Sequence, residues 1–153
     1  MTTSFAERFF DLDLWLAGAG HFLILLASFQ VPYQLGWRED LKQLMPFNRK
    51  LLWVQGGFTV LTILAFGTLT LTLHAELLRG DRAALGLALF IGTYWTARIL
   101  VDAVYFSHED WPQGRRFLLG HVLLTSLFGA LAVSYLGLFL WHVWPSACGV
   151  FQK

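Results

Sequence analysis

Arg98 and Asp102 form a charged pair in a segment, 83–106, that contains no other charged residue. The two residues are four positions apart, so on a helix they lie one turn apart on the same face. An ionised side chain inside a membrane costs at least a few kcal/mol, and such residues are therefore usually paired, turned inward and functional. The pair is the first candidate for a ligand-binding or proton-linked site.

Polar residues of other segments are expected at a similar depth. Gln55, Asp102 and His121 each lie four residues from one end of an apolar segment, which is about 6 Å at the helical rise. Arg98 lies one turn deeper. The full set of candidate site residues is Gln30 at the rim, Gln55, Tyr94, Arg98, Asp102 and His121. We expect the charged pair to face the interior, with Gln55 and His121 as its nearest polar neighbours, because buried charges need partners for their remaining donors and acceptors.

Two interpretations of this polar level are open. In the first, it binds the polar head group of a lipid, a quinone or a partner subunit, with Arg98 as the donor and His121 or Asp102 as the proton-linked group. In the second, the residues only hold helices together, or Arg98 extends toward the lipid head groups.

Three histidines are candidate haem ligands. A bis-histidine haem needs two ligands at matched depth on facing helices. His74 and His142 match in depth but lie at the water boundary, and His21 is deeper by about 10 Å at the helical rise. The alternative for His21 is a hydrogen bond to a neighbouring helix. No cluster in the sequence predicts a metal site.

Four apolar segments must position these residues: about 14–31, 51–73, 83–106 and 117–143. Their length is close to the roughly 20 residues that cross a bilayer, and they are continuous rather than alternating, which indicates helices and not barrel strands. Pro32 and Pro145 are expected to end the first and the fourth. With 56% hydrophobic and 14% charged residues, the sequence predicts an all-α integral membrane protein. Short connections favour a single four-helix domain over 1–153 in an up-down-up-down bundle, with a short interfacial segment in the first loop.

The distribution of basic residues predicts which side of the membrane each loop occupies. Six lie in the first and third loops: Arg38, Lys42, Arg49, Lys50, Arg115 and Arg116. Four lie on the opposite side: Arg8, Arg79, Arg82 and Lys153. The positive-inside rule therefore favours cytoplasmic first and third loops and non-cytoplasmic termini, in a bacterial inner membrane.

The function predicted from these features is non-catalytic. The sequence has no G-x-S-x-G, Walker, H-E-x-x-H or C-x-x-C motif, and a net charge of +1 gives no case for nucleic acid. We expect an accessory protein or subunit of a larger membrane complex, with partners in the bilayer. Two alternatives are a redox anchor that holds haem b or a quinone, and a small proton-coupled transporter that uses Asp102.

Overall fold

The computed structural model describes residues 5–34, 36–106 and 114–148, which are helical almost throughout and contain no strand. The long helices are α1 (Phe5–Gln34), α3 (Pro46–Thr72), α5 (Arg82–Tyr105) and α6 (Arg115–Cys148). The shorter elements are α2 (Trp37–Asp40), the 3₁₀ turn η1 (Leu41–Gln43) and α4 (His74–Arg79). The predicted all-α fold class is confirmed, and the first loop contains short helical elements.

Four of the described helices are long and apolar enough to cross a membrane. Their candidate spans are Phe5–Gln30, Pro46–Thr72, Arg82–Tyr105 and Phe117–Trp144. The third and fourth agree with the predicted 83–106 and 117–143 to within one residue. The second begins five residues earlier than predicted, because Pro46 occupies the first helical turn, where its fixed φ is compatible with a helix and its missing N–H is not needed.

The predicted start of the first span was wrong, whereas its predicted end at residue 31 is within one residue of the end of the candidate span at Gln30. α1 begins at Phe5 rather than near residue 14, and it continues through Pro32 to Gln34. Two acidic residues of its first half have partners on other helices: His74 lies 3.4 Å from Asp11, and the Ser134 hydroxyl donates to Asp13 at 2.8 Å. Pro32 lies in the last turn, where the lost backbone hydrogen bond is at the helix end. α6 likewise continues past Pro145 to Cys148.

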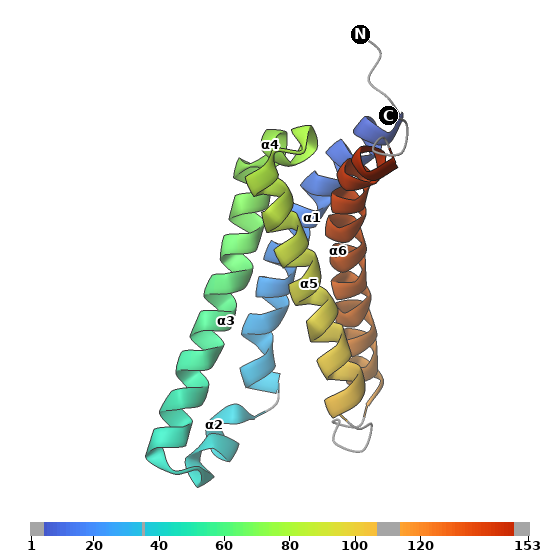
Figure 1. Cartoon of the computed structure of the whole chain (residues 1–153). Coiled ribbons are helices and arrows are strands. Elements are labelled where there is room, and N and C mark those ends of the chain that lie inside the picture. Colours follow the sequence, from blue (N-terminus) through green and yellow to red (C-terminus); the bar gives the residue numbers. More distant parts are fainter. Residues whose placement is uncertain (1–4, 35, 107–113, 149–153) are drawn as a thin grey trace.

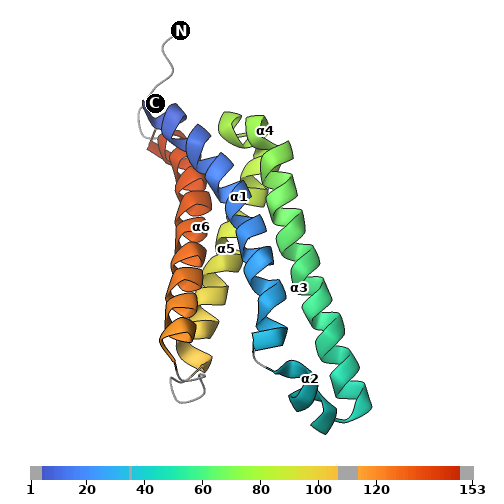
Figure 2. The ribbon, with the colours of Figure 1, turned by 180° about the vertical axis from the view of Figure 1, so that it is seen from behind.

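The long helices run roughly along one axis, so that their ends lie at the two ends of the molecule, and α3 diverges from α5 and α6 toward the end that carries α2 (Figures 1 and 2). One end, which we call the α4 end, carries α4, the start of α1 and the end of α6. The other, the α2 end, carries α2, the start of α3 and the end of α5. α1 packs against α3 and α6, and α5 packs against α6. Small residues permit these contacts: a Cβ on Gly67 of α3 would lie 3.0 Å from Cβ of His21 and 3.3 Å from the carbonyl oxygen of Gly18.

The hydrophobic core is confined to the half of the bundle near the α4 end. Buried side chains of the long helices lie within 14–25, 63–70, 84–95 and 128–138. We call these ranges the packed half. On the α2 side of the same helices, 26–34, 46–62, 96–105 and 115–127, no side chain whose burial the structure describes (all but those of residues 31, 34 and 116) is buried. We call these ranges the open half, and the candidate residues Arg98, Asp102 and His121 fall within it.

Candidate functional site

Asp102 is the centre of a polar cluster that bridges α5 and α6. Its Oδ1 lies 3.7 Å from Nη1 of Arg98, one turn earlier on α5. Its Oδ2 lies 3.5 Å from Nε2 of His121 and accepts a hydrogen bond of 3.5 Å from the Thr125 hydroxyl. We call Arg98, Asp102, His121 and Thr125 the Asp102 cluster. The predicted proximity of Arg98, Asp102 and His121 is present in the structure, because α5 and α6 pack together.

The members of the cluster differ in exposure. The Asp102 side chain is 11% exposed, whereas those of His121 and Arg98 are 30% and 41% exposed. The Asp102 carboxylate is therefore largely shielded from solvent, and each of its oxygens faces a side chain of the cluster. Arg98 and His121 form the accessible side of the cluster, in the half of the bundle that lacks a core.

Arg98 keeps hydrogen-bonding capacity that the described part of the chain does not use. A guanidinium carries five N–H donors, and the Asp102 contact at 3.7 Å is beyond hydrogen-bonding distance. The guanidinium carbon lies 5.6 Å from the centroid of the Phe128 ring, a cation–π distance. Arg98 is thus held on an aromatic face with donors available to an incoming acceptor.

Gln55, which was predicted at the same polar level, is not part of the cluster. It is exposed on α3, and its backbone carbonyl accepts a hydrogen bond from Thr59. Its side chain makes no hydrogen bond or ion pair with the Asp102 cluster among the described residues, so the expectation that Gln55 is a nearest polar neighbour of the pair is wrong. Gln30 is exposed near the end of α1. Equal depth along a helix does not bring side chains together where the helices are not packed.

Tyr94 lies at the boundary between the two halves. Its half-buried ring contacts Phe66 of α3 edge-on, with centroids 5.1 Å apart, and the neighbouring Trp95 at 5.3 Å. Trp95 in turn stacks on Phe128 of α6 at 4.7 Å. These aromatic rings form a layer across the bundle that separates the Asp102 cluster from the α4 end.

His21 lies at the centre of the packed half, fully buried. Its Nδ1 is 2.8 Å from the carbonyl oxygen of Ala17, which can only accept. Its Nε2 is 3.1 Å from Nε1 of Trp95, which can only donate. The ring is therefore a neutral imidazole with the proton on Nδ1 and with both nitrogens engaged. The interpretation of His21 as a helix-to-helix hydrogen bond is the one that the geometry supports.

The His21–Trp95 pairing was missed at the level of sequence, although a signal existed. Trp95 stands far from both ends of its apolar segment, whereas tryptophans of membrane helices concentrate at the interfaces. A buried indole N–H requires an acceptor. A second buried pair, the hydroxyls of Thr70 and Tyr135 at 2.6 Å, joins α3 to α6 in the same layer.

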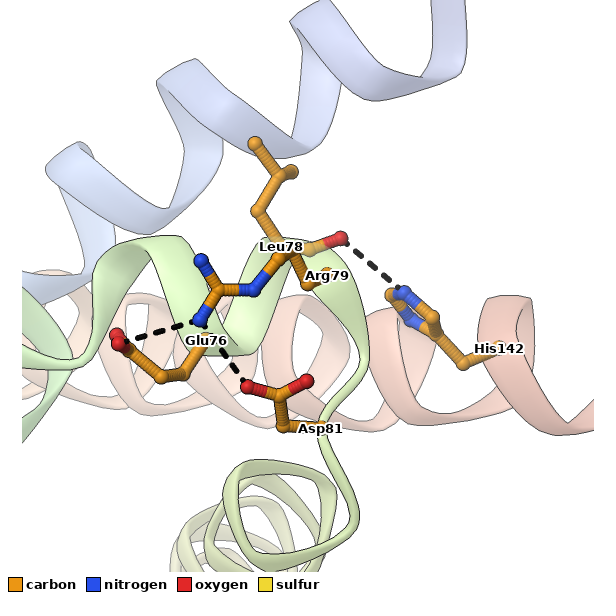
Figure 3. Close-up of polar contacts among 5 residues, drawn as sticks. All are labelled: Glu76, Leu78, Arg79, Asp81 and His142. Atoms are coloured by element: carbon orange, nitrogen blue, oxygen red, sulfur yellow. Dashed lines mark hydrogen bonds and ion pairs between the residues drawn. The ribbon is translucent and has the colours of Figure 1, made fainter.

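In all three haem candidates, Nε2 already has a hydrogen-bond partner. The Nε2 lone pair of His21 accepts the Trp95 donor. Nε2 of His74 faces the carbonyl oxygen of Asp11 at 3.2 Å, and Nε2 of His142 faces that of Leu78 at 3.2 Å (Figure 3). A carbonyl oxygen only accepts, so each of these two contacts is a hydrogen bond only when Nε2 carries the proton, and a protonated Nε2 has no lone pair for iron. In the described residues, no group of three or more His, Cys, Asp or Glu side chains is placed to hold a metal ion.

A charged network at the α4 end lies beside His142 (Figure 3). Nη2 of Arg79 lies 3.3 Å from Glu76 and 3.2 Å from Asp81. The hydrogen bond and the charge of Asp81, together with Glu76, raise the pKa of the Arg79 guanidinium, which therefore stays charged. Exposed ion pairs of this kind contribute little stability, so we assign the network to the solvated end of the bundle.

No protein-family model, curated protein or solved structure matches this chain. The function must therefore be argued from the geometry of the site alone.

Proposed function

We propose that the chain is an integral membrane protein whose four long helices cross the bilayer in up-down-up-down order. Support comes from the length and apolar composition of the helices and from the placement of their ends (Figures 1 and 2). Among the described residues, six basic residues lie toward the α2 end and three toward the α4 end. The six are Arg38, Lys42, Arg49, Lys50, Arg115 and Arg116, and the three are Arg8, Arg79 and Arg82. By the positive-inside rule, the α2 end is cytoplasmic, and the membrane that we propose is a bacterial inner membrane.

The proposed function is to hold a bilayer-soluble amphiphile by its polar head group, as a non-catalytic accessory protein of a membrane complex. The observation that carries this proposal is Arg98, a 41% exposed cation with unused donors in the open half. Inside hydrocarbon, unsatisfied polar groups cost several kcal/mol. A head group that accepts hydrogen bonds from Arg98 would remove that cost, and the exposed apolar side chains of the open half would contact its tail.

The transporter alternative receives less support. A transport route needs polar groups on both sides of the bilayer midplane. Between the Asp102 cluster and the α4 end, the bundle is filled by the stacked rings of Trp95 and Phe128 and by the buried His21. The polar side chains of the packed half are used in helix-to-helix hydrogen bonds.

Mass spectrometry of gently purified protein tests the proposal. The wild type, Arg98→Gln and the matched control Lys50→Gln would be reconstituted in nanodiscs of native lipid extract, and the molecules retained after delipidation compared. We expect one class of amphiphile in the wild type and the control that is depleted about tenfold or more in Arg98→Gln, as loss of hydrogen bonds to a charged group implies. The same retained molecules in all three proteins would overturn the head-group proposal.

Co-purification tests the accessory role separately. Crosslinking in native membranes, followed by purification of the tagged chain, is expected to recover a defined membrane-protein partner in stoichiometric amount. Recovery of the chain alone, across several detergents, would contradict the accessory role and leave the head-group proposal to its own test.

A further inference from the structure

We infer that the amphiphile held at Arg98 has an uncharged, flat head group with carbonyl acceptors, as quinones have. This inference rests on the proposed function and narrows it to one chemical class. Three observations carry it: the charge balance of the Asp102 cluster, the depth of Arg98 and the aromatic rings around it.

The charge balance favours an uncharged acceptor. The positive charge of Arg98 is already matched by Asp102 at 3.7 Å, so what remains available on Arg98 is its N–H donors rather than net charge. A phosphate at the same guanidinium would bring a second negative charge close to Asp102, and like charges at such distances disfavour each other. A carbonyl oxygen accepts the same hydrogen bonds without that repulsion.

The depth of Arg98 also argues against a lipid phosphate. Arg98 precedes Tyr105, the last residue of α5, by seven positions, which is about 10 Å along the helix axis. Helical side chains lean toward the helix N-terminus, which here carries the guanidinium further from the α2 end. The 24 residues of α5 span about 36 Å, against about 30 Å of hydrocarbon. Arg98 therefore lies several ångströms inside the hydrocarbon, below the level of phosphates but within reach of an uncharged head.

Aromatic side chains surround the donors. The guanidinium rests on the Phe128 ring at 5.6 Å, and Phe128 stacks on Trp95 with an interplanar angle of 22°. The half-buried Tyr94 stands one turn before Arg98 and offers a phenolic hydroxyl as a further donor. Flat conjugated rings pack well against aromatic faces and edges. Trp95 and Phe128 are buried, so the half-buried Tyr94 ring is the aromatic surface that remains for a ligand beside the Arg98 donors.

The inference is tested by quinone binding to the whole chain in nanodiscs of phosphatidylcholine. Decylubiquinone is the probe, and bound probe is quantified after equilibrium dialysis. We expect saturable binding of about one equivalent in the wild type and in Lys50→Gln. We expect a ten- to hundredfold weaker affinity in Arg98→Gln, from the loss of charge-assisted hydrogen bonds. With up to 30% phosphatidylglycerol in the nanodisc, the affinity of the wild type for decylubiquinone should stay within about twofold of its value in phosphatidylcholine alone.

The variant Asp102→Asn separates an uncharged ligand from an anion. Removal of the counter-charge leaves Arg98 as an unbalanced cation, so this variant should gain retention of phosphatidylglycerol that the wild type lacks. Retention of phosphatidylglycerol by the wild type through Arg98, without quinone binding, would overturn the inference while the head-group proposal stands. Absence of any Arg98-dependent molecule would overturn both.

Discussion

The indole N–H of Trp95 donates a hydrogen bond to Nε2 of His21, 74 residues away in the sequence, inside a layer to which all four long helices contribute. His21 belongs to α1 and Trp95 to α5, and the Thr70–Tyr135 pair joins α3 to α6 beside them. The His21 ring also lies edge-on to Tyr135, with centroids 5.9 Å apart. Hydrogen bonds in this layer therefore specify which helices meet and at what register.

Loss of the indole donor should destabilise the bundle. Trp95→Phe keeps an aromatic ring but leaves Nε2 of the buried His21 without a donor, which costs about 1–2 kcal/mol in the free energy of unfolding. Denaturation in mixed detergent micelles measures this free energy of unfolding. The control Trp53→Phe changes a half-exposed side chain and should stay within about 0.5 kcal/mol of the wild type. Equal stability of the two variants would contradict a structural role for the His21–Trp95 bond.

The close crossing of α1 and α3 should not tolerate a methyl group. In Gly67→Ala the new Cβ meets Cβ of His21 at 3.0 Å and the Gly18 carbonyl oxygen at 3.3 Å, so the helices must separate at a cost of about 1–3 kcal/mol. Gly57→Ala, on the same helix with nothing within 4 Å of the added Cβ, is the matched control and should be neutral or slightly stabilising. The test compares the unfolding midpoints of the Gly67→Ala and Gly57→Ala variants. The prediction fails if Gly67→Ala is no less stable than the control.

The turn after α4 should depend on a glycine for two separate reasons. Gly80 has φ +76°, a left-handed conformation, and an added Cβ would lie 2.6 Å from Nε2 of His142. We expect Gly80→Ala to lower the free energy of unfolding by about 2 kcal/mol or more, as strain and steric overlap add. In the background His142→Ala the steric part is absent, so Gly80→Ala should cost only about 1 kcal/mol there. Equal costs in both backgrounds would show that the His142 ring does not rest on Gly80.

The charged pair should show non-additive substitutions. Arg98→Ala leaves Asp102 with only His121 and Thr125 as partners, whereas the double variant with Asp102→Ala removes the carboxylate as well. We expect the single variant to be less stable than the double variant by about 1 kcal/mol, a modest value because Arg98 is partly exposed. Equal stability of the single and the double variant would mean that Asp102 does not carry a buried charge.

Cysteine accessibility tests the orientation. In a Cys148→Ser background, single variants Gln43→Cys at the α2 end and Asp81→Cys at the α4 end provide one thiol each. The positive-inside rule predicts that an impermeant maleimide labels Asp81→Cys in intact cells and labels Gln43→Cys only after permeabilisation. The reverse labelling pattern would place the α2 end outside.

Much of the fold was predictable, because the signals for long apolar helices are local. The limits of α5 and of the fourth candidate span were predicted to within one residue. The start of α1 was not, since the acidic residues Asp11 and Asp13 look solvated until their partners are docked. His74 is 3.4 Å from Asp11, and Ser134 is bonded to Asp13. Those partners are 63 and 121 residues away in the sequence.

The positions of the site residues were predictable only along the helix axes. Counting residues placed Asp102 and His121 at one depth, and the structure brings them to 3.5 Å. The same counting included Gln55, which lies on a part of α3 that packs against no charged member of the cluster in the described chain. Thr125 was missed, although it follows His121 by one helical turn and so shares its face. Rotation about the helix axis and separation between helices require the packed structure.

Because the core lies in one half of the bundle, the first part of α3 can tilt about the close contact of α3 with α1. This contact lies around Gly67, and the 21 residues back to Pro46 extend about 32 Å from it. A change of about five degrees in the tilt of α3 would move its first turn by roughly 3 Å at the helical rise. The buried side chains of this stretch, Ile63 and Phe66, lie within about one turn of Gly67, and Val60 packs against the core one turn further on. The displacement is therefore largest in the part of α3 that has no buried side chain. Widening at the α2 end is therefore energetically separate from unfolding, and a molecule can enter beside Arg98 while the packed half keeps its contacts.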